Sequence, residues 1–202
     1  MLRVPAFWRS VGATFLFAAI VAPVQILFGL IAALMVARPF PGVNVFLTTA
    51  VPTAVAAVAW GWFLHPIGGV VNRWLQTLGL PPQPWLTSVE LALPTLAIVT
   101  AWAGVGFTAI LLTAGLQQIP EDLYEAARID GASAWVQFWH ITLPLLSPTL
   151  FLVALLTMLS SLTAFGQIHL LTRGGPAEST MVWVYRIYQD TFFNFRFSYA
   201  SA

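Results

Sequence analysis

The sequence predicts an all-α protein, a polytopic bundle of transmembrane helices. Hydrophobic residues make up 59% of the 202 residues and charged residues only 7%, with a mean hydropathy of +0.84, whereas soluble proteins contain about 25% charged residues. The few charges are also unevenly distributed, because long uncharged stretches alternate with short polar segments. Such stretches suit the hydrocarbon core of a bilayer, which is about 30 Å thick. The lipid bilayer is therefore the first expected partner.

Four complete membrane-spanning helices are expected, with interfacial helices between them. The first lies between Arg9 and Arg38, where 28 consecutive residues carry no charge. At about 1.5 Å per residue they form roughly 42 Å of helix, enough to cross a bilayer with tilt. Further spans are expected at residues 43–64, 88–116 and 143–165, because each is apolar on all sides. Each span contains a proline that removes a backbone hydrogen bond and tends to kink a helix; these are Pro23, Pro52, Pro94 and Pro148.

The segments outside these spans carry turn signals. Residues 66–87 are rich in glycine and proline and are expected to form a loop with a short interfacial helix around residues 72–75. The third span is expected to open with a capping box, in which Thr87 and Glu90 bond each other's backbone N–H groups. After the fourth span a turn is predicted at residues 171–176, and no complete fifth span fits the remaining sequence.

Composition argues against several classes of function. Cysteine and lysine are absent, so the chain has neither a thiolate nor the lysine of a phosphate-binding loop. Apart from Glu90 at the start of the third span, no ionisable residue lies inside a predicted span, which argues against proton-coupled or sodium-coupled transport. A net charge of +1 gives no sign of a nucleic-acid partner. No cofactor or metal is expected, because the three histidines lack a metal-binding spacing; they are His65, His140 and His169.

The charged residues concentrate in one short segment between the third and fourth spans. Five of the fifteen charged side chains fall between Glu121 and Asp130. Pro120 stands at a plausible first helical position, acids follow in the first turn, and Gly131 comes at the end. This order predicts a short helix displayed outside the membrane.

The short helix is expected to present two different sides. By the spacing of three and four residues, one side carries Leu123, Ala126, Ala127 and Asp130, and the other carries Glu121, Tyr124, Glu125 and Arg128. The first side is small and flat, so another surface can approach the backbone closely. Gly131 is expected to adopt the positive φ that ends a helix and redirects the chain. Ser133 is expected to cap a second short helix, lying along the membrane and leading into the fourth span.

The segment from Glu125 to Pro148 resembles the EAA loop of the permease subunits of binding-protein-dependent ATP-binding cassette importers. The residues that match this loop in order and spacing are Glu125, Ala126, Ala127, Asp130, Gly131, Ala132, Phe138, Ile141, Leu143, Pro144 and Pro148. Other segments resemble the carbohydrate branch of this family, the maltose and glycerol-3-phosphate type. They are residues 7–10, 68–72, 172–176 and 185–188, so the likeness covers nearly the whole chain.

The resemblance implies a MetI-like transmembrane domain in a bacterial or archaeal inner (plasma) membrane, which imports a sugar or related polyol and is not itself an enzyme. A cytoplasmic ATP-binding cassette ATPase dimer would hydrolyse ATP, and an extracytoplasmic solute-binding protein would deliver the substrate. A second permease subunit would complete the pathway in a heterodimer. Family members of this branch have one more helix at each end, so residues 1–202 are expected to be one permease domain without those two helices.

The resemblance also assigns roles within residues 119–141, the coupling loop. Glu125 would make a polar contact to the ATPase, the alanines would allow close approach, and Gly131 would form a bend between two short helices. The residues expected to couple to the ATPase are Glu125, Ala126, Ala127, Asp130, Gly131 and Ala132. Those expected to pack the loop against the following span are Phe138, Ile141, Leu143 and Pro144.

The distribution of arginine opposes the orientation that this motif implies. With the acidic segment in the cytoplasm, only Arg38 and Arg128 lie inside, whereas the positive-inside rule expects most arginines there. The motif is given more weight, because orientation is often set by the first helix and its flank. The arginines placed outside are Arg3, Arg9, Arg73, Arg173, Arg186 and Arg196.

An alternative function stays open for the sequence. The chain could be a non-transporting membrane scaffold whose acidic loop recruits a soluble partner. Solute flux distinguishes this scaffold from a permease. An intramembrane enzyme is a third reading, but the spans offer no convergent set of acid, base or metal-binding groups.

Overall fold

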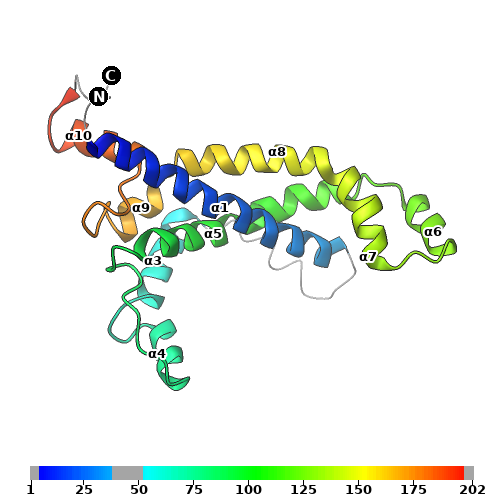
Figure 1. Cartoon of the computed structure of the whole chain (residues 1–202), viewed down its shortest axis with the longest axis horizontal. Coiled ribbons are helices and arrows are strands. Elements are labelled where there is room, and N and C mark those ends of the chain that lie inside the picture. Colours follow the sequence, from blue (N-terminus) through cyan, green and yellow to red (C-terminus); the bar gives the residue numbers. More distant parts are fainter. Residues whose placement is uncertain (1–4, 38–51, 198–202) are drawn as a thin grey trace. The chain divides into compact units, whose positions relative to one another are not determined.

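The computed structural model describes residues 5–37 and 52–197, and its regular structure there is entirely helical (Figure 1). The helices are, in chain order, α1 (Pro5–Ala37), α3 (Thr53–Phe63), α4 (Val70–Thr77), α5 (Ala92–Leu116), α6 (Glu121–Ile129), α7 (Ala134–Gln137), the π-helical turn η1 (Phe138–Thr142), α8 (Leu143–Leu162), α9 (Gly166–Leu171) and α10 (Trp183–Phe192). The predicted all-α fold class is confirmed.

Three helices within the described ranges are long and apolar enough to cross a membrane. They are Pro5–Val36, Ala92–Leu116 and the continuous stretch Ala134–Leu162, with 32, 25 and 29 residues. The first, third and fourth expected spans are therefore confirmed as long apolar helices. Of the second expected span, the structure describes α3, which has 11 residues. Residues 43–51 of that span lie outside the described residues.

The predicted capping box at the start of the third span is wrong. Helix α5 begins at Ala92, later than the box requires. The backbone N–H of Glu90 donates to the hydroxyl of Ser88 at 3.3 Å, and not to Thr87. The Ser88 hydroxyl competes locally for the same N–H, and the helix starts one turn further on.

Two of the four prolines expected to kink a span lie inside helices, Pro23 in α1 and Pro148 in α8. Pro52 is the N-cap of α3, and Pro94 is the third residue of α5. Backbone N–H groups at these positions have no intrahelical partner, so proline removes no hydrogen bond there. The physical basis for a kink is thus absent at Pro52 and Pro94.

The chain divides into two compact units, and the three long helices contribute to both. The first unit comprises Met1–Ala22, Val51–Ala103 and Met158–Ala202. The second comprises Pro23–Ala50 and Gly104–Thr157. The acidic segment and the start of α8 both belong to the second unit, so the candidate site is built within one unit.

In the first unit, the Thr14 hydroxyl ties α1 to the start of α10. This side chain is 4% exposed, donates to the Ser10 carbonyl at 2.7 Å and accepts the Trp183 N–H at 2.9 Å. The Thr14 hydroxyl thus satisfies one of the N–H groups at the start of α10 that have no partner within the helix.

Helix α3 packs closely on α9, because a Cβ added to Gly166 would lie 3.1 Å from Thr53 Cγ2.

Asn72 organises the polypeptide between α3 and α5. Its side chain is 1% exposed, and Nδ2 donates to the carbonyl oxygens of Pro66 at 3.2 Å and Gln83 at 3.0 Å. Its Oδ1 accepts the Gln83 N–H at 3.0 Å and the Trp85 indole N–H at 2.9 Å. Every donor and acceptor site of the amide is used, so one side chain holds both ends of this loop.

Replacing Asn72 by alanine is expected to loosen the loop of residues 66–85. The change removes four hydrogen bonds and leaves buried N–H and C=O groups without partners, at a cost of about 1–3 kcal/mol. Limited proteolysis of the assembled, detergent-purified protein should show faster cleavage in this loop. Gln83→Ala is the matched control, because only the backbone of Gln83 serves Asn72. Equal cleavage rates for both variants would contradict the role of Asn72.

In the second unit, α1, α5 and α8 meet at a core of four buried residues, Ala33, Leu112, Leu146 and Val153. A Cβ on Gly29 would lie 2.8 Å from Thr108 Cβ, and one on Gly115 would lie 2.9 Å from Leu146 Cδ1. These glycines therefore set how closely the helices approach. Close packing of small residues is what holds helices together in lipid, where water does not drive their association.

A buried amide also joins α1 to α5, a contact that the sequence pattern does not predict. Gln25 is 6% exposed, and its Nε2 donates to Thr108 Oγ1 at 2.9 Å and to the Gly104 carbonyl at 3.2 Å. An interhelical hydrogen bond of this kind contributes about 1 kcal/mol in a membrane. The available signal was an isolated Gln in an otherwise apolar run.

Candidate docking site at the acidic loop

The acidic segment folds as the predicted helix, which is α6. Pro120 is its N-cap, with φ −60° and ψ 134°, so the helix begins one residue later than expected. Glu121 and Asp122 lie in its first turn and Arg128 in its last. This charge order complements the helix dipole and stabilises α6 at both ends.

Helix α6 ends in a Schellman motif centred on Gly131. The Gly131 N–H donates to the Arg128 carbonyl at 3.1 Å, and the Ala132 N–H donates to the Ala127 carbonyl at 2.8 Å. Gly131 has φ +77°, which confirms the predicted positive φ. A Cβ added to Gly131 would meet nothing within 4 Å. Backbone conformation, and not lack of space, is therefore what favours glycine here.

Ser133 caps the next helix, as predicted, since its Oγ accepts the Val136 N–H at 3.4 Å. The expected second short helix is α7, which leads through η1 into α8 without a break, as predicted. In η1 the Leu143 N–H donates to the Phe138 carbonyl, five residues earlier. This π turn accommodates Pro144, which has no N–H and would clash with the carbonyl four residues before it in a regular α-helix.

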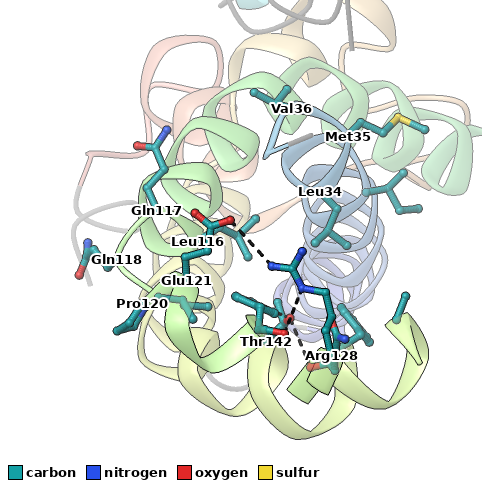
Figure 2. Close-up of a pocket in the computed structure, with 16 residues that line it drawn as sticks. Leu34, Met35, Val36, Leu116, Gln117, Gln118, Pro120, Glu121, Arg128 and Thr142 are labelled. Carbon is teal, nitrogen blue, oxygen red and sulfur yellow. Dashed lines mark hydrogen bonds and ion pairs between the residues drawn. The ribbon is translucent and has the colours of Figure 1, made fainter. Parts of the chain in front are cut away.

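One side of α6 faces a cleft with a volume of about 1320 Å³. Glu121, Tyr124 and Arg128 line it. Residues at the ends of α1 and α5 also line it, among them Leu34 and Leu116 (Figure 2). Arg128 Nη2 lies 4.0 Å from Glu121 Oε1, with side chains 59% and 82% exposed. Such an exposed pair contributes at most about 1 kcal/mol. Arg128 Nε also donates to the Tyr124 carbonyl at 3.2 Å, which holds the guanidinium along the helix.

The other side of α6 is exposed. Glu125, Ala126 and Asp130 lie there, with Ile129 88% exposed and Leu123 43% exposed. Within the described part of the chain, no hydrogen bond or ion pair engages the Glu125 carboxylate. The exposed Ile129 side chain and the neighbouring Glu125 carboxylate make this side suitable for contact with another protein.

Helix α6 is regular from Glu121 to Ile129, so the predicted grouping of Glu125 with Glu121, Tyr124 and Arg128 on one side holds by helical spacing. Glu121, Tyr124 and Arg128 line the cleft, whereas Glu125 is not among the lining residues and is exposed. Ala126 is also exposed, and Ala127 is half-buried.

The residues expected to pack the loop against α8 lie in and around η1. Phe138 lines the cleft, Ile141 and Leu143 are partly buried, and Pro144 is exposed. The Phe138 ring stacks on Trp135, with centroids 6.2 Å apart and an interplanar angle of 28°. Aromatic contacts thus stiffen the helical path between the Gly131 bend and α8.

A family model described as binding-protein-dependent transport system inner membrane component matches residues 3–201. The chain belongs to this family. The permease is 34% identical over 203 residues to the sulfoquinovosyl glycerol transport system permease protein SmoG of Agrobacterium fabrum, covering 98% of the permease and 66% of that relative. It is 37% identical over 185 residues to the trehalose/maltose transport system permease protein MalF of Thermococcus litoralis, covering 89% and 63%. The permease spans slightly less than two thirds of the length of both relatives.

A solved structure agrees with this assignment. The permease superposes with a TM-score of 0.86 and 25% identity on a chain of a bacterial ABC transporter involved in the import of the acidic polysaccharide alginate, covering 99% of the permease and 73% of that chain. By family the chain is thus an inner membrane component of a binding-protein-dependent transport system, and it shares the fold of that ABC transporter chain. The family that the acidic loop suggested in the sequence is confirmed.

Proposed function

We propose that this permease forms half of the translocation pathway for a sugar or related polyol in an ATP-driven importer. The names of two relatives, one for sulfoquinovosyl glycerol and one for trehalose and maltose, support this substrate class. The described long helices carry no charged residue between Ser10 and Ala37 or within α5 and α8. A hydroxyl-rich solute suits such a path, because it can be bound through hydrogen bonds from polar groups along the helices.

Helix α6 is proposed as the coupling helix, which docks on a cytoplasmic ATP-binding cassette ATPase dimer. The observation that carries this proposal is the exposed side of α6, where the Glu125 carboxylate, which has no partner among the described residues, adjoins Ala126 and Ile129. The small alanine lets a partner surface approach the helix backbone, and the carboxylate offers a charge-assisted hydrogen bond. The Gly131 bend fixes the direction in which α6 leaves the membrane-spanning part.

The remaining partners follow from the same proposal. A second permease subunit completes the pathway, most simply as a heterodimer, and an extracytoplasmic solute-binding protein delivers the solute. Nucleotide binding by the ATPase biases the two permeases between inward-facing and outward-facing states, a rigid-body switch. Residues 1–202 act as one permease domain in this scheme, with residues 119–141 as its coupling loop.

Uptake by the complete transporter tests this function. Vesicles containing both permeases and the ATPase, supplied with the solute-binding protein, should accumulate a sugar or related polyol when ATP is provided. The solute that co-purifies with the solute-binding protein identifies the compound to try first.

Vesicles without this chain, and vesicles with an ATPase variant that cannot hydrolyse ATP, are the controls. Absence of uptake from a complex that still binds the ATPase would point to the scaffold alternative. Accessibility of a cysteine introduced at Glu121 tests orientation, because the natural chain has no cysteine. Labelling of that cysteine only from outside the cell would contradict the coupling role of α6.

A further inference from the structure

We propose that Tyr124 is the positioning residue that fixes α6 to the start of α8, through its hydrogen bond to Thr142 in the π turn. This inference rests on the proposed coupling function of α6. Within that function, Tyr124 makes the displacement of α6 by the ATPase reach the membrane-spanning helix without being absorbed by the loop between them.

The two hydroxyl groups form a short bond between elements that are distant in sequence. Tyr124 Oη and Thr142 Oγ1 lie 2.9 Å apart, and 18 residues separate them along the chain. Thr142 is 6% exposed and Tyr124 is half-buried at the cleft. Thr142 Oγ1 also lies 3.5 Å from the Gln137 carbonyl, which can only accept. The consistent assignment has Tyr124 donating to Thr142 and Thr142 donating to Gln137.

The backbone alone offers a poor mechanical connection over this distance. Between α6 and α8 the chain passes the left-handed Gly131 and then the π turn η1. Each is a place where backbone geometry departs from a regular helix, and π turns are frequent at functional sites. A rotation of α6 could therefore be taken up at Gly131 or in η1 before it reached α8.

Side chains bridge both of these points. Gln137 Nε2 donates to the Ala132 carbonyl at 2.9 Å, which spans the bend. The Tyr124 to Thr142 bond spans the bend and nearly all of η1 together. With both bonds in place, α6, α7 and the start of α8 form one body. The tyrosine ring supplies the reach, and the buried threonine supplies an anchor inside the turn.

Removing the Tyr124 hydroxyl should separate ATP hydrolysis from transport. In the complete transporter, Tyr124→Phe is expected to lower the solute imported per ATP hydrolysed by roughly two- to tenfold, the range that loss of one hydrogen bond produces in an equilibrium. ATPase binding should persist, because the exposed side of α6 is untouched. Thr142→Val should give a similar loss. Thr142→Ser, which keeps the hydroxyl, should retain the natural ratio of solute imported to ATP hydrolysed.

The double variant and a matched control separate positioning from general destabilisation. Tyr124→Phe combined with Thr142→Val should be no worse than either single change, since both remove the same bond. Thr113→Val is the control, because the Thr113 hydroxyl bonds only within its own helix, to the Ala109 carbonyl at 2.7 Å. An unchanged ratio in Tyr124→Phe, additive losses in the double variant, or an equal loss in Thr113→Val would each overturn the inference.

A distance measurement gives a second readout that does not depend on transport. Spin labels on cysteines introduced at Asp122 and Ser147, both exposed, report the separation of α6 from α8 in the assembled complex. With Tyr124 present, one narrow distance distribution should persist with and without nucleotide. In Tyr124→Phe the distribution should broaden when nucleotide binds; equal widths would contradict the proposed link.

The experiments distinguish this inference from the function on which it rests. If the unmodified transporter imports solute with ATP and Tyr124→Phe keeps its coupling ratio, only the role of Tyr124 falls. If the unmodified transporter binds the ATPase and shows no ATP-driven uptake, the proposed function falls and takes the inference with it.

Discussion

Replacing Gly131 by valine is expected to remove most substrate uptake while the permease still inserts and assembles with its partners. Gly131 has φ +77°, a conformation that costs an L-residue about 1–2 kcal/mol and a β-branched residue more. The helix end would rewind to relieve this strain, and the Ala132 N–H would lose the Ala127 carbonyl. A free-energy cost of about 1–2 kcal/mol lowers the population of correctly bent loops by roughly 5–30-fold. Uptake per ATP hydrolysed in reconstituted vesicles measures the loss.

Two further variants isolate the conformational cause. Gly131→Asn should be milder, because asparagine tolerates the left-handed region better than other side chains. Gly79→Val is the matched control, since Gly79 has φ +76° and ends α4 in the same pair of bonds, with no atom near an added Cβ. The same backbone strain there should leave coupling intact. Equal losses at the two glycines would mean that strain in general, and not the bend after α6, reduces uptake.

Replacing Glu125 by alanine is expected to weaken ATPase binding more than any other single change on the exposed side of α6. The carboxylate has no partner among the described residues and is exposed, so its removal changes the stability of the free permease little. In the proposed complex it is buried against a donor of the ATPase. Loss of one partner of a buried, hydrogen-bonded charge pair costs about 2–5 kcal/mol. Titration of the ATPase onto the permease complex in lipid nanodiscs would show this as a raised Kd.

Conservative and neighbouring substitutions test whether the effect belongs to this carboxylate. Glu125→Gln keeps an acceptor oxygen and should fall between the natural residue and alanine. Asp122→Ala removes another exposed acid from the first turn of the same helix and should change the Kd little. If the Kd instead depends only on the net charge of α6, long-range electrostatic attraction, and not a specific contact of Glu125, accounts for the binding.

The sequence by itself determined the fold class and the local devices of the acidic loop. Long uncharged stretches become helices because lipid offers no partner for backbone polar groups. The positive φ of Gly131 and the cap at Ser133 were also predictable, since each depends on residues within about five positions along the chain. The order of residues in this loop also gave the family.

Only the tertiary structure decided which groups meet across the chain. Gln25 with Thr108, and Tyr124 with Thr142, bond across 83 and 18 residues. The exposed position of Glu125 likewise depends on how α6 and η1 pack beside the cleft. The physical reason lies in the spans themselves. Helices that are apolar on all sides carry no pattern that separates a lipid-facing side from a helix-facing one, so their contacts are set by close packing between distant residues.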